Sequence, residues 1–325
     1  MTEKQKIALY WCASCGGCEE SVIDLAQDLL EVAGAVEIVF WPVAMDFKYA
    51  DVAAIKDNEI AVTLINGSIR TDEQEHMAKV LRKKSKLLMA HGSCAHLGGI
   101  VGLANLFEAS EVLGRSYKEV PSVNNPQGVL PQTKTVESGR EVTLPGFHDT
   151  VRALDQTVAV DYYIPGCPPT PELVKDAIMM VLEDRLPPRG SVLADRKALC
   201  ETCPRRDSRP DKVKISELHR VHEIEWDPHK CFLDQGIICL GPATRGGCMA
   251  RCIHANMPCR GCFGPTDKVV DQGAKCVSFL ASILDSTDEE ELQTMAEAIP
   301  DPAGLFYRYS LPSSLLRRKM KGRTL

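Results

Sequence analysis

The sequence predicts an α/β fold: a parallel sheet with helices on both faces, followed by an irregular cysteine-rich region with few helices. Short apolar segments alternate with amphipathic helical segments over roughly the first 190 residues, as in a parallel sheet with crossover helices. Nine of the 14 cysteines lie between Cys200 and Cys276, where Gly and Pro are frequent and hydrophobic periodicity is weak. We therefore expect two domains, residues 1–189 and 190–325.

Five segments of the first domain have the short apolar composition of buried parallel strands. They are residues 7–11, 35–40, 60–65, 86–90 and 158–164.

Amphipathic helices are predicted between these strands. One covers residues 19–33 and is expected to stop at Gly34. The next begins at Thr71, which forms a capping-box pair with Gln74.

A further helix is predicted from Thr170-Pro171, because Pro suits the first helical position. Residues 115–150 lack a clear period and are expected to form a long functional loop. In the second domain, short helices are predicted at residues 276–284 and 287–299.

Composition argues against several classes of protein. The formal net charge is −6 and the pI about 5.8, so a nucleic-acid groove, which is usually basic, is not expected. The longest apolar run, residues 35–45, is far shorter than the roughly 20 residues that span a bilayer, so no membrane association is expected. The N-terminus has neither a secretory apolar segment nor a twin-Arg pair, which predicts a cytoplasmic protein.

The cysteines of the first domain follow predicted strands. Cys12, Cys15 and Cys18 come after the first strand, Cys94 after the fourth and Cys167 after the fifth. Because ligands bind outside the carboxyl ends of strands in open α/β sheets, these loops are expected to converge on one thiolate site. The spacing leaves open which two of the first three cysteines take part.

Eight cysteines of the second domain form two groups of four in chain order. They are Cys200, Cys203, Cys231 and Cys239, then Cys248, Cys252, Cys259 and Cys262. Disulfides rarely persist in a reducing compartment, so cysteines at this density indicate thiolate ligands.

Zinc and iron–sulfur clusters both bind such thiolates. Structural zinc favours paired C-x-x-C or Cys2His2 spacing, and only Cys200/Cys203 and Cys259/Cys262 form such pairs in the second domain. Iron–sulfur clusters use more varied spacing, often among Gly and Pro. The spacing therefore favours clusters and electron transport, with a zinc-stapled interaction module as one alternative.

Short motifs around these cysteines resemble a known family. In the first domain, SCGGCE at 14–19, GSCA at 92–95 and GCPP at 166–169 are similar to the proximal-cluster motifs of nickel–iron hydrogenase small subunits. In the second, LCETCP at 199–204, GIICLGP at 236–242 and PCRGC at 258–262 resemble the gamma subunit of the cytosolic methyl-viologen-reducing hydrogenases, which are allied with heterodisulfide reductase.

The resemblance implies a flavodoxin-like first domain and three 4Fe–4S clusters. The proximal cluster would lie on Cys15, Cys18, Cys94 and Cys167, the medial one on Cys248, Cys252, Cys259 and Cys262, and the distal one on Cys200, Cys203, Cys231 and Cys239. Membrane-bound and periplasmic relatives have His at the position of Cys200 and often Pro at that of Cys252. Cys12 and Cys276 match no ligand position and are expected to be buried apolar thiols.

The resemblance also implies the function: an electron-transfer subunit of a hydrogenase, an oxidoreductase acting on H2. Asp227-Pro228 is followed by His229 rather than Cys, and the chain has no other candidate nickel–iron motif, so that site is expected in a large partner subunit. The implied partners are this large subunit, a 2Fe–2S delta-type subunit and the heterodisulfide reductase complex. A complex I-type, quinone-linked subunit with one cluster is the second alternative.

Overall fold

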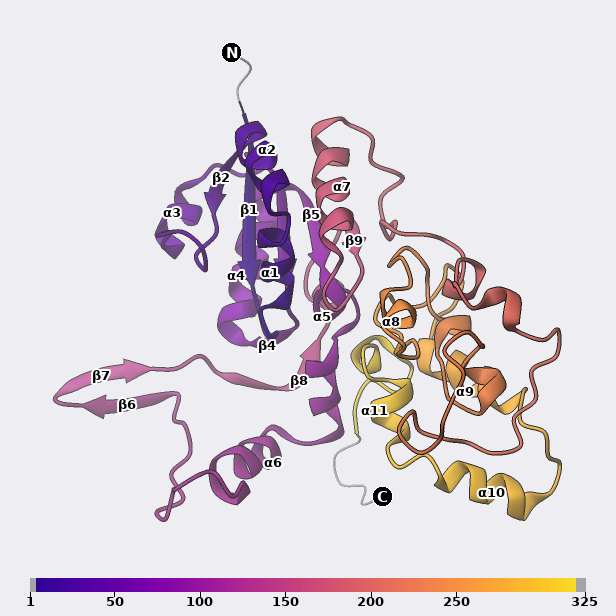
Figure 1. The fold of residues 1–325 in the computed structure, drawn as a ribbon. Coiled ribbons are helices and arrows are strands. Elements are labelled where there is room, and N and C mark those ends of the chain that lie inside the picture. Colours follow the sequence, from indigo (N-terminus) through magenta and orange to yellow (C-terminus); the bar gives the residue numbers. More distant parts are fainter. Residues whose placement is uncertain (1–3, 320–325) are drawn as a thin grey trace.

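The computed structural model describes residues 4–319, and its first half is built on a five-stranded sheet (Figure 1). The strand order is β2-β1-β3-β5-β9, and all four neighbouring pairs are parallel. The strands are β1 (Gln5–Trp11), β2 (Val36–Phe40), β3 (Ile60–Asn66), β5 (Ser85–His91) and β9 (Tyr162–Ile164). Counted within the sheet alone, this is the 2-1-3-4-5 order of flavodoxin-like folds, which confirms the predicted fold class.

Helices cover both faces of the sheet because its strands are apolar on both sides. On one face lie α1 (Gly17–Ile23), α2 (Gln27–Ala35) and α7 (Pro171–Leu182). On the other lie α3 (Tyr49–Ala54), α4 (Asp72–Lys84) and α5 (Gly92–Leu97). In β3, Leu64 packs into the first layer and Ile65 into the second, as the period of two in a strand requires.

The predicted starts of α4 and α7 are confirmed. Thr71 Oγ1 accepts a hydrogen bond from the Gln74 N–H at 3.3 Å, and Gln74 Oε1 accepts one from the Thr71 N–H at 3.1 Å. Thr170 Oγ1 accepts a hydrogen bond from the Leu173 N–H at 3.4 Å, with proline at the first helical position. These side chains satisfy N–H groups that have no partner inside the helix.

The predicted helix over residues 19–33 is wrong in two respects. The chain breaks it between α1 and α2, where Ala26 has a φ of 52° and Leu25 turns into the apolar core. Helix α2 also continues through Gly34 to Ala35. A helix that stops at glycine usually ends in a left-handed residue, but here the next residue, Val36, is extended and begins β2 directly.

Residues 115–150 do not form one irregular loop, contrary to expectation. Strands β6 (Lys134–Glu137) and β7 (Arg140–Thr143) pair as an antiparallel hairpin, which projects as an arm from the body (Figure 1). Ser138 and Gly139 both have positive φ, as a tight hairpin turn requires. The arm returns through β8 (Phe147–Arg152), which pairs antiparallel with β4 (Ile69–Thr71).

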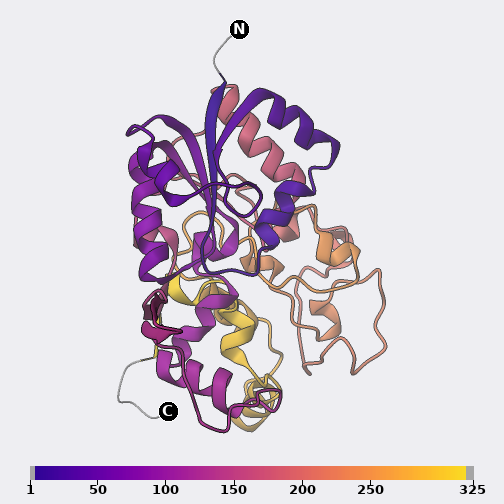
Figure 2. The same cartoon turned by 90° about the vertical axis from the view of Figure 1, so that its left-hand side faces the viewer.

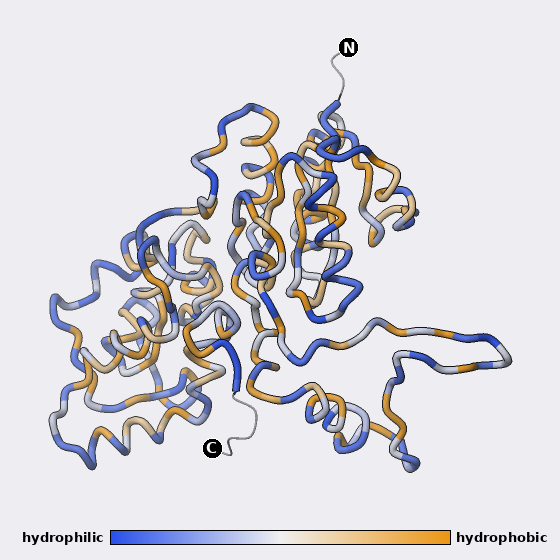
Figure 3. The backbone as a smooth tube through the Cα atoms, turned by 180° about the vertical axis from the view of Figure 1, so that it is seen from behind, coloured by the Kyte–Doolittle hydropathy of each residue, from blue (hydrophilic) through white to orange (hydrophobic). Residues whose placement is uncertain are grey.

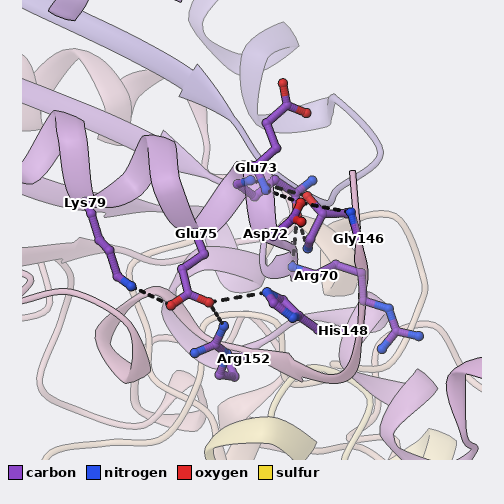
Figure 4. A network of polar contacts seen from close by, with 10 residues as sticks. Arg70, Asp72, Glu73, Glu75, Lys79, Gly146, His148 and Arg152 are labelled. Atoms are coloured by element: carbon purple, nitrogen blue, oxygen red, sulfur yellow. Dashed lines mark hydrogen bonds and ion pairs between the residues drawn. The ribbon is translucent and has the colours of Figure 1, made fainter. Parts of the chain in front are cut away.

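Ionic contacts fasten the base of this arm to α4 (Figure 4). Glu75 accepts hydrogen bonds from Lys79, at 2.6 Å, and from Arg152, and these contacts lower the pKa of Glu75 to about 2. The Gly146 N–H donates to Asp72 Oδ1 at 2.9 Å. The contacts of Arg152 and Gly146 link residues more than 70 positions apart, which is why the sequence alone does not reveal them.

Between residues 190 and 319 the helices are short. They are α8 (Arg251–His254), α9 (Gln272–Ala281), α10 (Glu289–Glu297) and α11 (Pro302–Phe306), of which α9 and α10 begin at the N-caps Asp271 and Asp288 rather than at the expected positions. The remaining helical segments, in both halves, are α6 (Ala109–Gly114), η1 (Ile100–Leu106), η2 (Arg115–Glu119), η3 (Leu154–Gln156), η4 (Leu199–Glu201), η5 (Arg206–Ser208), η6 (Leu233–Gln235), η7 (Gly241–Ala243) and η8 (Leu311–Ser313).

The C-terminal segment returns to the first half, as the yellow ribbon beside η1 shows in Figures 1 and 2. The Gly99 N–H donates to the Tyr309 carbonyl at 3.0 Å, and Gln156 Nε2 donates to the Pro312 carbonyl at 2.8 Å. Pro312 fills the space where Gly98 and Gly102 lack a Cβ. The end of the described chain thereby becomes part of the first unit.

Apolar segments concentrate in the sheet and its covering helices, whereas the arm alternates in hydropathy (Figure 3). Within residues 4–319, no single helix is long and apolar enough to cross a membrane. One pair of helical stretches, Gly92–Leu106 and Ala109–Glu119, reaches that length and composition only together, with a bend of 78° between them.

Replacing Leu64 with Ala tests the sheet core. Leu64 is 1 % exposed in the central strand, so the lost contacts and the cavity should lower the free energy of unfolding by about 2–5 kcal/mol. Urea denaturation measures the loss. Val136→Ala, on the arm at 67 % exposure, is the control and should change stability by less than about 0.5 kcal/mol. Equal losses would contradict the central position of Leu64.

Candidate functional site

Four thiols of the first half meet at the carboxyl edge of the sheet. Cys15 and Cys18 follow β1, Cys94 lies in α5 directly after β5, and Cys167 follows β9. Burial raises the pKa of the Cys18 thiol, and the nearby Cys94, Cys167 and Cys15 raise it further. Burial, Cys167 and Cys15 likewise raise the pKa of Cys94, to about 12. The four thiols are therefore close enough to act on one another.

Cys12 lies outside this group. It is 4 % exposed and packs in the apolar layer that contains Tyr10 and Phe40. Burial alone raises the pKa of the Cys12 thiol, without a contribution from another thiol. The structure thus groups Cys15 and Cys18, rather than Cys12, with the two distant cysteines.

Two glycines leave room for the sulfur atoms. A Cβ at Gly92 would lie 2.3 Å from Cys18 Sγ, and a Cβ at Gly99 would lie 2.3 Å from Cys94 Sγ. Both glycines also have positive φ, which side chains disfavour. Close backbone approach to the thiols therefore requires glycine at both positions.

Backbone N–H groups point at the buried sulfur atoms. The N–H groups of Ile100 and Val101, at the start of η1, hydrogen-bond Cys94 and lower its pKa against the effect of burial. In the second half, the Gly241 and Cys259 N–H groups hydrogen-bond Cys239 and lower its pKa. The Cys259 nitrogen lies 3.3 Å from Cys239 Sγ. Such donors stabilise an anionic sulfur, the form that binds metal.

A second group of thiols surrounds η4 and η7. Burial raises the pKa of the Cys200 thiol to about 12, with further contributions from Cys239, Cys203 and Cys231, while Arg209 lowers it. The four cysteines of the predicted distal set are thus brought together by turns and short helices.

The third group is centred on Cys262. Burial raises the pKa of this thiol to about 12, and Cys248, Cys252 and Cys167 raise it further. Cys259 lies between the second and third groups, because Cys239 and Cys262 both raise its pKa after burial.

The first and third groups touch directly at Cys262. The Cys167 N–H hydrogen-bonds the Cys262 thiol, and Ser93 Oγ donates to the Cys262 carbonyl. The Ser93 N–H in turn donates to the Gly166 carbonyl at 2.7 Å. Three loops that carry predicted ligands are therefore hydrogen-bonded to one another.

Cys276 packs in an apolar cluster with Leu280 and Phe306 and is 2 % exposed. Burial raises the pKa of its thiol to about 12, and Asp271 and then Cys239 raise it further.

A buried carboxyl group lies next to the first thiol group. Glu19 is 6 % exposed and accepts hydrogen bonds from Trp41 Nε1 and Asn66 Nδ2. Burial raises the pKa of Glu19, and these two donors partly offset the rise. The sequence alone does not distinguish this buried carboxyl group from an exposed acidic side chain in the first turn of the helix, where a negative charge interacts favourably with the helix dipole.

The groups around Cys18, Cys200 and Cys262 consist of thiols, which are the ligands of iron–sulfur clusters. Among residues 4–319, no three His, Cys, Asp or Glu side chains are placed as a site for one metal ion.

Comparison with known proteins places these features in a family. Residues 15–181 match the family described as NADH ubiquinone oxidoreductase, 20 Kd subunit. The iron-sulfur subunit of the F420-non-reducing hydrogenase of Archaeoglobus profundus is 40% identical over 318 residues, 97% of this chain and 98% of that protein. A vhu subunit of the F420-non-reducing hydrogenase of Methanocaldococcus jannaschii is 37% identical over 316 residues, 97% of this chain and 98% of that protein.

The fold is also found in a solved structure. A chain of the recombinant [NiFeSe] hydrogenase from Desulfovibrio vulgaris Hildenborough aligns with a TM-score of 0.53 and 17% identity, covering 82% of this chain and 96% of that one. At this identity the likeness concerns the fold alone.

Replacing Gly92 with Ala tests the contact between this glycine and Cys18. Gly139 provides the matched control, since it also has positive φ but its Cβ would meet nothing within 4 Å. Both substitutions should cost about 1 kcal/mol in backbone strain. Gly92→Ala should lose at least about 1 kcal/mol more, because its Cβ overlaps a buried sulfur. Urea denaturation under anaerobic conditions measures both, and equal losses would contradict the contact.

Proposed function

Because this chain belongs to the family of these F420-non-reducing hydrogenase subunits, we propose that it is the electron-transfer small subunit of a nickel–iron hydrogenase. The observation that carries the proposal is that the thiols gather around three positions, Cys18, Cys200 and Cys262, with Cys259 between the last two. The first group lies at the carboxyl edge of the sheet, and the other two lie in a half of the chain that has little other core.

We assign one 4Fe–4S cluster to each group. The proximal cluster would be held by Cys15, Cys18, Cys94 and Cys167, the medial cluster by Cys248, Cys252, Cys259 and Cys262, and the distal cluster by Cys200, Cys203, Cys231 and Cys239. When bound, such clusters take up and release single electrons.

The protein itself positions the sulfur atoms, excludes water from around them and donates hydrogen bonds to them. Buried glycines let the backbone approach the sulfur atoms, and backbone N–H groups donate to them. The hydrogen bonds of Cys167 and Ser93 to Cys262 hold the proximal and medial loops at a fixed separation. A fixed, desolvated arrangement of this kind favours electron transfer, because little has to reorganise when the charge moves.

Electrons would enter at the sheet edge, from a large subunit that holds the nickel–iron site and splits H2. They would leave from the second half of the chain, towards a 2Fe–2S delta-type subunit and then a heterodisulfide reductase complex. We place the assembly in the cytoplasm. The chain's lack of a Cys after Asp227-Pro228 supports placing the hydrogen-splitting site in the partner.

A complex I-type subunit is the second candidate, because the matched family covers residues 15–181, which contain only the proximal group. The relatives that align over 97% of the chain also cover the second half, which favours the hydrogenase function.

Counting iron distinguishes these candidates. Chain purified anaerobically in its complex should carry about twelve irons, three four-iron clusters, in addition to the iron of the large subunit. A complex I-type subunit predicts about four. Iron and zinc analysis with visible absorbance provides the measurement. A colourless chain with stoichiometric zinc would instead establish the zinc-stapled module.

Exchanging single cysteines tests the ligand assignment at the N-terminus. Cys15→Ser should remove about four irons per chain, because it deletes one proximal ligand. Cys12→Ser is the matched control and should leave the iron content unchanged, since Cys12 packs in the apolar layer. Iron analysis and EPR of the reduced chain measure the result. If Cys12→Ser lost the cluster and Cys15→Ser kept it, the assignment would be reversed.

A further inference from the structure

The C-terminal segment, residues 309–319, is hydrogen-bonded to both halves of the chain, and we call it the strap. In the second half, the Leu315 N–H donates to Asp271 Oδ2 at 3.0 Å. In the first half, Asn105 Nδ2 donates to the Arg317 carbonyl at 2.9 Å, and Asn105 is 1 % exposed. The strap is thus anchored on either side of the first thiol group rather than lying loosely on the surface.

The strap packs on the turn that follows Cys94. A Cβ at Gly99 would lie 2.3 Å from Cys94 Sγ. On the other side of the turn, a Cβ at Gly98 would lie 2.2 Å and one at Gly102 2.4 Å from Pro312 Cγ. The turn is therefore held between the Cys94 sulfur and the Pro312 ring, with no room for a side chain at either contact.

Two backbone N–H groups at the end of this turn hydrogen-bond the Cys94 sulfur. They belong to Ile100 and Val101, and they lower the pKa of Cys94 against the effect of burial. The direction of these groups depends on the turn, which is fixed to the strap because the Gly99 N–H donates to the Tyr309 carbonyl at 3.0 Å. Hydrogen bonds to the sulfurs influence the electronic properties of an iron–sulfur cluster. The strap therefore acts on the Cys94 sulfur through the backbone.

The strap also keeps water away from this sulfur. Cys94 is 8 % exposed, and Leu311 of the strap is 1 % exposed. The Tyr309 side chain lies close to the contact between the first and third thiol groups, because Cys262 and Cys167 raise its pKa after burial. Solvent access is a second property of the surroundings that influences a cluster.

We propose that Pro312 is a positioning residue for the proximal ligand Cys94. Its ring, seated on Gly98 and Gly102, fixes the turn that directs the two N–H groups and closes the path from solvent to the sulfur. The strap supplies no ligand and acts on the cluster only through this turn. This inference rests on the proposed function, which makes Cys94 a ligand.

Replacing Gly102 with Ala tests the seat of the ring. Gly102 does not have positive φ, and the three atoms nearest to its Cβ position all belong to Pro312, so the added methyl group displaces the ring without straining the backbone. In the whole hydrogenase complex, about four irons should pass to a chelator roughly tenfold faster than in the wild type, because the overlap opens the turn locally. The EPR signal of the reduced proximal cluster should change in shape, and the other two signals should not.

A compensating substitution and a control make the test specific. Pro312→Ala removes the two ring carbons nearest to the Gly102 Cβ position and leaves Cβ, at 3.9 Å, in ordinary van der Waals contact. The double substitution G102A/P312A should therefore restore the wild-type EPR signal and bring iron release to within about threefold of the wild-type rate. Gly34→Ala is the matched control in α2, where the new Cβ meets nothing within 4 Å, and it should change neither property.

Three results would overturn the inference. They are a G102A complex that behaves as the Gly34→Ala complex does, a double substitution that restores nothing, and faster loss of iron from all three clusters alike. The last would show that the strap stabilises the fold without positioning Cys94. A wild-type chain with far fewer than about twelve irons would instead refute the proposed function, which separates the two failures.

Discussion

The parallel arrangement of the sheet is the constraint on which the candidate centre depends. Parallel strands all end at one edge, so loops that follow β1, β5 and β9 meet although their cysteines are separated by up to 152 positions, from Cys15 to Cys167. The helices that return the chain between strands cover both faces and leave that edge as the place where loops gather. No disulfide or long-range side-chain network is needed to bring the thiols together.

The second half is organised differently. Its short helices enclose two small apolar clusters, and several of its cysteines pack at the margins of these clusters. Burial of so many thiols without a large hydrocarbon core contributes little packing energy. The free energy of metal binding would therefore contribute a large share of the stability of this half, as in small metal-stabilised domains. The hydrogen bond from Ser93 Oγ to the Cys262 carbonyl also links the second half to the sheet domain, which has the larger apolar core.

Local sequence signals predicted the fold well where one residue controls one feature. Thr71 and Thr170 mark helix starts because capping depends on residues within one turn. The break at Ala26 was missed because it serves the burial of Leu25, which depends on tertiary packing. The hairpin of the arm was missed although Ser138-Gly139 is a turn signal, because its strands are exposed and lie outside the apolar core.

The sequence predicts the groups of thiols from their position after strands and from their order in the chain, and the structure brings Cys15, Cys18, Cys94 and Cys167 near one another. Separating Cys12 from Cys15 and Cys18 required the structure or the family resemblance, because all three follow β1 at equal spacing. The contact of Cys167 with Cys262 had no local signal at all. Hydrogen bonds between distant loops depend on how the two halves are docked, which neither propensity nor periodicity encodes.

The return of the C-terminal segment to Gly98 and Gly102 has a consequence for biosynthesis. The strands and helices of the first half are synthesised well before Tyr309 and Pro312, which contact the loop after Cys94. The nascent chain thus leaves this loop uncovered until these later residues have been synthesised. A loop that carries one of the predicted ligands is therefore open to solvent during synthesis, before the later segment folds back over it.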